Sequence, residues 1–491
     1  MAGIPRSKRN RFASVVIVLG LALLTVHPAS ATGADNQGAA GLVRHWNSIA
    51  LDAAGLDDTP VAPDEDRVFG EQLGPGRSSR AMAIVHIAMF DAINAIRGRF
   101  HTYTGIHGHR RASMDAAIVQ AAHDTLASLY PSQASKFDSL LAQDLNSIHT
   151  GRHAKDHGIR LGRAAADAIL GLRANDGSQV PEPHVGVDFI PSLLPGMWRQ
   201  DPISLLSVAL GAYWGEVQPF VLASASQFRA PVPPALTSPE YVSAYDEVKE
   251  IGGDGIDTAT SRTPEQTEVG IFWAYDGTPS LCAPPRLYNQ IAVTIADRMG
   301  TTSDVEQFSR LLALVNVAMA DAGIAIWESK YFYQYWRPIT GIRESDPGTG
   351  PTGLGDSNPA TTGDPGWSPL GAPASNLVAV NFTPPFPSYP SGHAGFGGAL
   401  FQTLRRFYGT DEIAFRFMSD EFNGVTKDDN GVVRPVVIRS FPTLSQAEEE
   451  NGQSRIYLGI HWRFDKTEGI AQGRKIGDWV FEHAFTSMHD K

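Results

Sequence analysis

Apolar residues recur every three or four positions along most of this chain, and this period constrains its fold more than any other feature. Residues 79–96 (SRAMAIVHIAMFDAINAI) show the pattern clearly, with Ser78 or Ser79 placed to cap the helix. We therefore predict an all-α fold. Further helices are expected over 113–129, 133–148, 156–172, 264–274, 285–299, 305–336, 393–408, near 411–422, from about 444 and over 466–488.

Breaks in the helical pattern suggest two helical bundles with long loops. Residues 177–202 are rich in Pro, Gly and His, so we expect an N-terminal bundle over 32–202 and a C-terminal helical domain over 203–491. A second irregular stretch, 344–390, is long enough to be either functional or disordered. Asn430-Gly431 between GVTKD and VVRPVVI predicts a minor β-hairpin.

The charge balance excludes some partners. The net charge of the 491 residues is -12, which argues against non-specific binding to nucleic acid or to an acidic membrane surface. Cys282 is the sole cysteine, so no intrachain disulfide can form, and a buried packing role is expected for it.

The N-terminus has the features of a Sec-type signal peptide spanning residues 1–31. A basic start precedes the apolar run 12–26 (FASVVIVLGLALLTV), and small residues at 29–31 form a cleavage site. The apolar run is shorter than the about 20 residues that a transmembrane helix needs. No later segment is expected to be long and apolar enough to span a bilayer. The mature protein is therefore predicted to be secreted and free of the membrane.

Lys330 and Arg337 lie in the aromatic segment 330–338 (KYFYQYWRP). On one continuous helix, residues seven apart point within about 20° of each other. Trp327 would lie on the same side, and Pro338 would end the helix. A solvated charged face is the usual alternative, but the aromatic neighbours favour burial, and buried cations need an anionic partner.

A second segment, 390–394 (PSGHA), predicts a helix N-terminus after the long loop. Ser391 suits the N-cap position, and Gly392 lets a ligand approach the backbone closely. Free amides at helix N-termini bind oxyanions. An ordinary capped helix with His393 on the surface is the competing interpretation.

The third segment, 454–465 (SRIYLGIHWRFD), adds Arg455 and His461. Asp465, four residues after His461, could orient the imidazole, but pairing with Arg463 or Lys466 at the surface is slightly preferred. Together the three segments supply cations, a hydroxyl, a glycine amide and two histidines. This set suits one tetrahedral oxyanion, with one histidine bonding its central atom and the other moving protons.

These segments resemble the signatures of the vanadium-dependent haloperoxidases, and among them the chloroperoxidases. That family belongs to one superfamily with type 2 phosphatidic acid phosphatases and bacterial acid phosphatases. The runs that carry the resemblance are 386–401 (FPSYPSGHAGFGGALF), 273–277 (WAYDG), 284–291 (PPRLYNQI) and 458–465 (LGIHWRFD). The likeness covers roughly the C-terminal half of the chain.

The resemblance implies an orthovanadate cofactor, with phosphate able to substitute for it. The residues that would hold it are Lys330, Arg337, Ser391, Gly392, Arg455 and His461. His461 would be the axial vanadium ligand and His393 the acid–base group, while Lys330 would polarise the peroxide. Trp327 and Phe386 would flank the halide. Asp276 would pair with Arg455.

The implied reaction is the oxidation of halide by hydrogen peroxide to hypohalous acid, with an organic acceptor left open. An acid phosphatase with a phosphohistidine at His461 is the alternative, because phosphate and vanadate share shape and charge. A non-catalytic anion-binding scaffold is a third hypothesis. Phe386 favours chloride, but the choice among chloride, bromide and iodide stays open, as does the oligomeric state.

Overall fold

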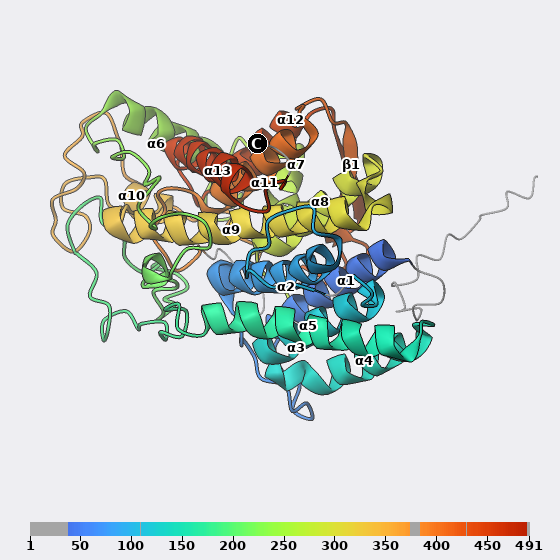
Figure 1. Cartoon of the computed structure of the whole chain (residues 1–491). Coiled ribbons are helices and arrows are strands. Elements are labelled where there is room, and N and C mark those ends of the chain that lie inside the picture. Colours follow the sequence, from blue (N-terminus) through green and yellow to red (C-terminus); the bar gives the residue numbers. More distant parts are fainter. Residues whose placement is uncertain (1–37, 109, 374–382, 429, 489–491) are drawn as a thin grey trace, which may run out of the picture.

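The structure is a computed structural model that describes residues 38–108, 110–373, 383–428 and 430–488 (Figure 1). These residues form thirteen α-helices and one two-stranded sheet, which confirms the predicted mainly helical fold with a minor β-hairpin. The predicted signal peptide lies outside the described residues. The helices are α1 (Ala39–Asp57), α2 (Gly74–Arg97), α3 (Met114–Leu129), α4 (Ala134–Ser147), α5 (Arg152–Arg173), α6 (Pro239–Ile251), α7 (Pro264–Phe272), α8 (Pro284–Arg298), α9 (Val305–Tyr333), α10 (Pro338–Arg343), α11 (Gly392–Tyr408), α12 (Leu444–Tyr457) and α13 (Arg463–His483).

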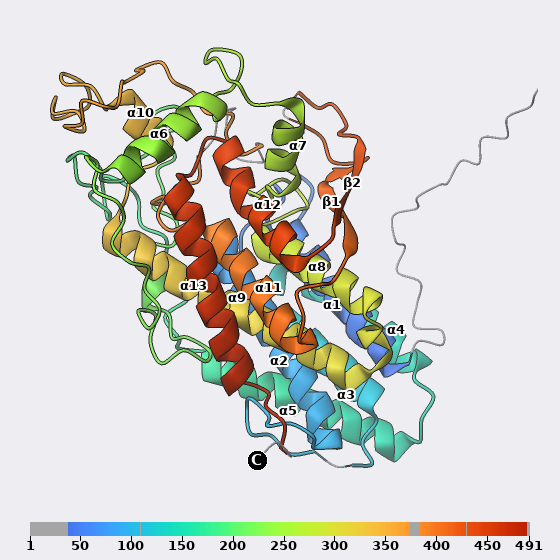
Figure 2. The same ribbon diagram turned by 90° about the horizontal axis from the view of Figure 1, so that it is seen from above.

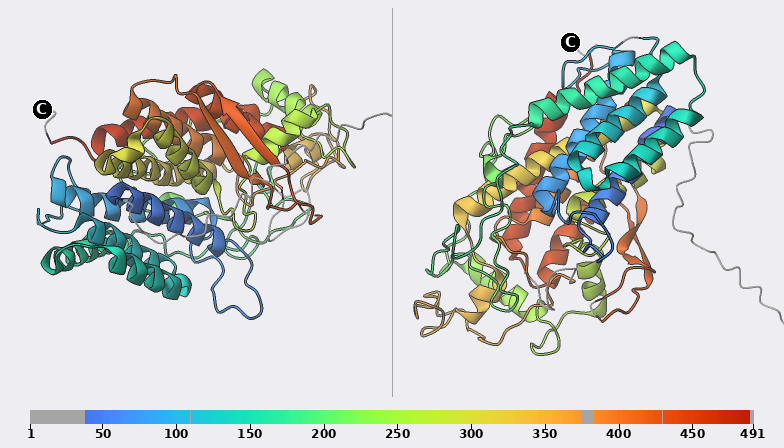
Figure 3. Two further views of the ribbon diagram at one scale, coloured as in Figure 1. Left: turned by 90° about the vertical axis from the view of Figure 1, so that its right-hand side faces the viewer. Right: turned by 90° about the horizontal axis from the view of Figure 1, so that it is seen from below.

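Helix α9 runs through the middle of the molecule (Figures 1 and 3). It packs against α2 of the N-terminal bundle on one side and against α11 and α13 on the other. By length and composition, α2 and α9 could each cross a membrane, so the expectation that no such segment follows the N-terminus was wrong. However, 89% and 94% of their apolar windows are buried inside the protein. Their apolar character therefore serves the core, which is continuous between the two bundles. The domain boundary at 202/203 stays a prediction.

Glycines bring α11 and α13 into close contact, and the two helices lie side by side in Figure 2. A Cβ atom on Gly473 would lie 2.1 Å from the carbonyl oxygen of Gly395, and one on Gly469 would lie 2.7 Å from that of Ser391. No side chain fits between these backbones. The close approach fixes the N-terminus of α11 against the start of α13, where the Ser391 N–H donates to the carbonyl of Asp465 at 2.9 Å.

The helix predicted near 411–422 was wrong. Strand β1 (Phe415–Asn423) occupies this segment and pairs in antiparallel fashion with β2 (Val436–Phe441). Burial alternates along the first part of β1, with Phe415 and Phe417 inside, so the apolar period there is two. The predicted hairpin is present, but its first strand precedes the GVTKD run. Helices α1, α6 and α10 were not predicted.

Candidate active site

The two cations of the first motif do not share one helix face as predicted. Helix α9 ends at Tyr333 because Gln334 adopts the left-handed conformation, with φ 48°. Arg337 is the N-cap of α10, and Pro338 begins that helix instead of ending the previous one. Proline suits the first helical turn because no intrahelical partner exists for an N–H there. Arg337 thus reaches the site from a separate element.

Both side chains are nevertheless buried and lie against the same short loop segment. Lys330 Nζ donates to the carbonyls of Pro387 and Ser388, each at 2.8 Å, and Arg337 Nε donates to that of Phe386 at 2.9 Å. Burial lowers the pKa of Lys330 well below its usual value, and the nearby Arg337 charge lowers it further. Burial likewise lowers the pKa of Arg337, to about 9.

Arg455 brings the third cation from the last turn of α12. Its Nη2 donates to Asp276 Oδ2 at 2.7 Å, so the ion pair implied by the resemblance is present. Its Nε and Nη1, like Nη2 of Arg337, are buried and have no hydrogen-bond partner in the described residues. Leaving buried charged donors unpaired is costly. The donor set therefore fits a bound oxyanion that accepts these hydrogen bonds.

His461 sits among the cations, with its Nε2 3.2 Å from Arg337 Nη1. Its Nδ1 lies 2.8 Å from Asp465 Oδ2, a carboxylate oxygen that accepts the Nδ1–H. This arrangement leaves a lone pair on Nε2. Burial lowers the pKa of His461 well below 6.5, and Arg337 and Lys330 lower it further, so the ring is neutral and available as a ligand.

The preferred surface pairing of Asp465 was wrong. Arg463 pairs with Glu247 and Lys466 with Glu449, which leaves the buried Asp465 to orient His461 and to accept the Trp462 N–H at 3.0 Å. Burial raises the pKa of Asp465 to about 7, while Lys330 opposes the rise.

The N-terminus of α11 has the predicted cap. The Ser391 side chain accepts from the Ala394 N–H at 3.4 Å, and Gly392 is the first helical residue. A Cβ on Gly392 would lie 3.2 Å from the Trp327 ring, which is tighter than an ordinary contact, so glycine suits this position beside the aromatic ring.

His393 is buried rather than exposed. Its Nε2 lies 2.6 Å from the carbonyl of Ala274 and 4.0 Å from Asp276 Oδ1. Burial, followed by the charge of Arg455, lowers the pKa of His393 well below 6.5.

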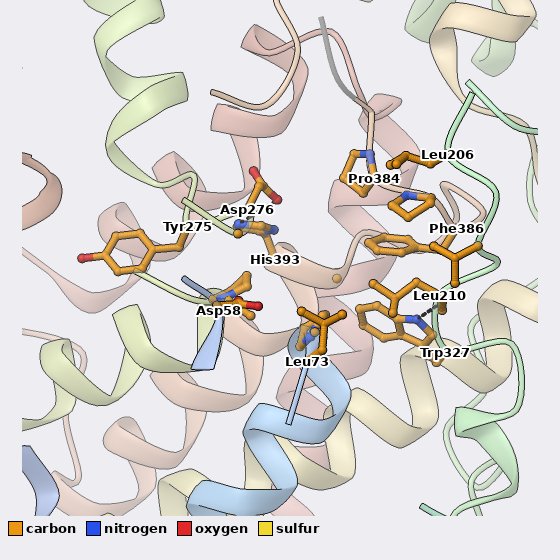
Figure 4. Close-up of a pocket in the computed structure, with 18 of the residues that line it drawn as sticks. Asp58, Leu73, Leu206, Leu210, Tyr275, Asp276, Trp327, Pro384, Phe386 and His393 are labelled. Atoms are coloured by element: carbon orange, nitrogen blue, oxygen red, sulfur yellow. Dashed lines mark hydrogen bonds and ion pairs between the residues drawn. The ribbon is translucent and has the colours of Figure 1, made fainter. Parts of the chain in front are cut away.

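Trp327 and Phe386 form an aromatic wall beside the cations, with ring centroids 4.9 Å apart. Lys330 Nζ lies 5.1 Å from the centroid of Phe386. This wall, together with His393, Arg455 and His461, borders a cavity of about 360 Å³ (Figure 4). All ten residues predicted for the site thus lie in or directly beside one buried cluster.

Sequence reasoning missed the residues that hold the loop carrying Asp276. Glu421 of β1 accepts hydrogen bonds from the Tyr275 N–H and the Thr278 hydroxyl, each at 3.0 Å, and pairs with Arg434. The β-hairpin thereby positions Asp276 against Arg455. The segment of Glu421 was predicted to be helical, so its sequence gave no signal for this contact.

Fold and site together define a mainly helical protein with a buried cluster of cations whose unpaired N–H groups fit an oxyanion. Vanadium chloroperoxidase of Curvularia inaequalis is 32% identical to this chain over an alignment that covers 86% of this chain and 78% of that protein. A family model described as the VCPO second helical-bundle domain matches residues 310–490. The chain belongs to the vanadium haloperoxidase family and is an enzyme of that type.

Solved structures show the same fold. A structure described as the first bacterial vanadium-dependent iodoperoxidase superposes with a TM-score of 0.68 and 23% identity, covering 92% of this chain and 98% of its own. A holo-type bacterial vanadium-dependent chloroperoxidase superposes with a TM-score of 0.60 and 16% identity, covering 88% of this chain and 94% of its own.

Proposed function

We propose that this enzyme binds orthovanadate and oxidises halide ions with hydrogen peroxide to hypohalous acid. The observation that carries the proposal is the set of buried guanidinium nitrogens, Nη2 of Arg337 and Nε and Nη1 of Arg455, that find no acceptor within the part of the chain that the structure describes. The residues that would hold the vanadate are Lys330, Arg337, Ser391, Gly392, Arg455 and His461. His461 would bond vanadium through Nε2, because Asp465 already occupies Nδ1.

When bound, vanadate supplies a Lewis-acidic centre that activates peroxide without a change of valence. The protein would supply charge and proton transfer. Lys330 would place its positive charge beside the peroxide. His393 rests neutral because of burial and Arg455, so it can accept a peroxide proton, and Asp276 lies close enough to stabilise the resulting imidazolium.

Trp327 and Phe386 would exclude water from the halide position. An apolar aromatic wall lowers the local dielectric and strengthens the attraction between a halide and Lys330. Phe386 favours chloride as the substrate, and bromide and iodide serve as comparison substrates in the assay.

The test is halogenation of a phenol dye by the purified protein with orthovanadate, peroxide and each halide in turn. We expect turnover that depends on added vanadate and is lost in His461→Ala. The matched control is His483→Ala, an exposed histidine at the far end of α13, the helix that follows His461, which should keep wild-type turnover. Absence of vanadate-dependent turnover at every pH from about 4 to 8, where histidines change charge, would refute the proposal.

Phosphatase activity is the second candidate, favoured by the lone pair of His461 Nε2 among the cations. His461 would attack the phosphorus atom to give a phosphohistidine, and His393 would protonate the leaving group. By the same likeness of phosphate and vanadate, phosphate would occupy the vanadate-free site. Hydrolysis of an aryl phosphate that vanadate inhibits would favour the phosphatase over the haloperoxidase.

Export completes the proposed function. The basic start, the apolar run and the small residues before position 32 support secretion with removal of residues 1–31. The check is N-terminal sequencing of protein collected from the culture medium. A retained N-terminus in cell-associated protein would contradict it.

A further inference from the structure

A second cavity lies in the N-terminal bundle, where α2, α3 and α5 pack together (Figures 1 and 3). Its volume is about 660 Å³, and it shares no lining residue with the cavity beside the cationic cluster. Most of its lining residues are polar or charged, and they include Glu71, Arg77, Arg80, Arg173, Ser178 and Gln179. Gln179 is exposed, so the cavity reaches the protein surface. A solute can therefore enter it without a rearrangement of the bundle.

Three arginines bring positive charge to this cavity. Arg77 and Arg80 lie three residues apart in α2 and so share a face of that helix, while Arg173 comes from the last turn of α5. Arg80 is 8% exposed and Arg173 is 3% exposed. Buried charges of one sign need groups of the opposite sign beside them.

The protein supplies one carboxylate for two of these guanidinium groups. Asp176 Oδ2 accepts from Arg80 Nε at 2.7 Å and from Arg173 Nε at 2.8 Å, and Arg77 pairs with Glu182. Burial lowers the pKa of Arg80; Asp176 opposes this change, and the charges of Arg173 and Arg77 add to it. Two carboxylates thus face three guanidinium groups.

Glu71, the carboxylate of the lining, does not make up the difference. Its Oε1 accepts from the Ser132 N–H at 3.1 Å, and its Oε2 accepts from the Ser132 hydroxyl at 2.8 Å. In the described part of the chain, the ion pairs of the three arginines go to other carboxylates. Each oxygen of Glu71 keeps a lone pair, so this side chain can also accept from a hydroxyl group of a ligand.

Arg80 keeps one donor for a ligand. Its Nε bonds to Asp176, and its Nη2 donates to the carbonyl of Arg173 at 2.8 Å, so the guanidinium plane is held in place. Its Nη1 makes no hydrogen bond to the residues that the structure describes. Arg77 is held similarly, because its Nη2 donates to the carbonyl of Val180 at 2.8 Å. A planar guanidinium suits the oxygens of phosphate, and donors fixed in advance favour affinity.

A purely structural role is the competing explanation, since the arginines join α2 and α5 to the segment after α5. Buried ion pairs, however, often stabilise a fold no better than apolar packing does. The cluster has more guanidinium groups than carboxylates, and it is open to solvent in a chain of net charge -12. A ligand that brings the missing negative charge explains this excess better.

We propose that this cavity binds a phosphate group, with Arg80 Nη1 as a donor and the charges of Arg77 and Arg173 beside it. The volume exceeds what one phosphate ion needs, and Glu71 can accept from a hydroxyl group. The phosphate group can therefore belong to the free ion or to a small hydroxylated ester. The site does not depend on the proposed haloperoxidase function.

The test counts binding sites by calorimetry at physiological ionic strength, where weak surface attraction is screened. Inorganic phosphate is titrated into wild type, Arg80→Gln and Arg163→Gln. Arg163 is an exposed arginine of α5 outside the lining, so the same substitution there is the matched control. Phosphate can also occupy the catalytic site, so the proteins are compared with one another. Arg80→Gln should lose one site or bind there at least tenfold more weakly, whereas Arg163→Gln should match wild type.

Arg80→Gln should fold, because Asp176 keeps its ion pair with Arg173. If it does not fold, Gln179→Glu decides the test, since it brings a negative charge to the exposed edge of the cavity. Its control is Gln143→Glu, an exposed position of α4 outside the lining. Equal numbers of sites with equal affinities in wild type and the cavity variant would overturn the proposal and leave the arginines a structural role.

Glycerol 3-phosphate distinguishes the two sources of the phosphate group. Binding at this site at least tenfold tighter than that of inorganic phosphate would assign it to a phosphate ester, and equal or weaker binding would assign it to the free ion. Vanadate-dependent turnover tests the proposed function separately, because the two cavities have different linings.

Discussion

Replacing Gly473 with alanine should force α13 away from α11 and disrupt the site at their junction. The new Cβ would lie 2.1 Å from the Gly395 carbonyl oxygen and 2.8 Å from the Ala399 nitrogen. Carbon–oxygen contacts of this kind are normally about 3.3 Å or longer, so the helices must separate by about 1 Å. The atoms in conflict belong to the backbone and cannot rotate aside. Overpacking of this kind costs about 1–3 kcal/mol or more.

The same displacement should reduce turnover, because Ser391 at the start of α11 and His461 before α13 would move apart. A misplacement of about 1 Å can cost about 100-fold in rate. The measurements are the midpoint of thermal unfolding and the vanadate-dependent kcat. The control is Gly171→Ala on α5, where a Cβ meets nothing within 4 Å. That change should stabilise by about 0.5–1 kcal/mol and leave kcat unchanged. A Gly473→Ala variant that unfolds at the wild-type temperature would refute the reasoning.

Three further variants probe residues that support the site or the core. Glu421→Ala leaves Arg434 buried without its counter-charge and should cost about 3–5 kcal/mol, measured as the loss of stability on thermal unfolding; wild-type stability would contradict it. Asp465→Ala removes the acceptor of His461 Nδ1 and should weaken vanadate binding about 10–100-fold by titration; unchanged affinity would show that the carboxylate does not support the ligand. Burial lowers the pKa of His86 to about 4 in the folded protein, whereas its pKa in the unfolded chain is near 6.5. Between these two pH values the unfolded chain takes up a proton at His86 and the folded protein does not. The free energy of unfolding therefore falls as pH falls from about 6.5 to 4. Between pH 7 and 5, denaturant titrations should show that His86→Gln loses about 2 kcal/mol less of this free energy than wild type does. Equal losses in the two proteins would count against His86 as the cause.

The helical elements were predictable because their period is local. Residues 113–129 were predicted as a helix, and α3 covers Met114–Leu129. The failure at β1 has a local cause as well, since the alternation of Phe415, Phe417 and Ser419 was read as a helix. Pairing with β2, more than a dozen residues further along the chain, decides the conformation. The strand propensity of one segment does not predict which distant segment it pairs with.

The site was predictable in its residue types but not in its geometry. Lys330 and Arg337 reach the same site, but not from one helix face as their spacing suggested. The left-handed residue Gln334 ends α9 between them and turns the chain. Asp465 illustrates the same limit. Its neighbours Arg463 and Lys466 suggested a surface pair, but both find carboxylates on other helices, Glu247 and Glu449. Which partner an ion selects depends on elements that are distant in sequence.

The charge distribution explains why such a site must be supported from several elements. Three buried cations, Lys330, Arg337 and Arg455, arrive from α9, the start of α10 and α12. The carboxylates among them, Asp276 and Asp465, are fewer, so the cations repel one another. Burial lowers the pKa of Lys330, and the charges of Arg337 and Arg455 lower it further. Burying this imbalance costs stability. The surrounding contacts, from the α11–α13 backbone packing to the hydrogen bonds of Glu421, offset that cost and keep the donors aimed at one place. An oxyanion that neutralises them would therefore stabilise the fold and complete the site through the same hydrogen bonds.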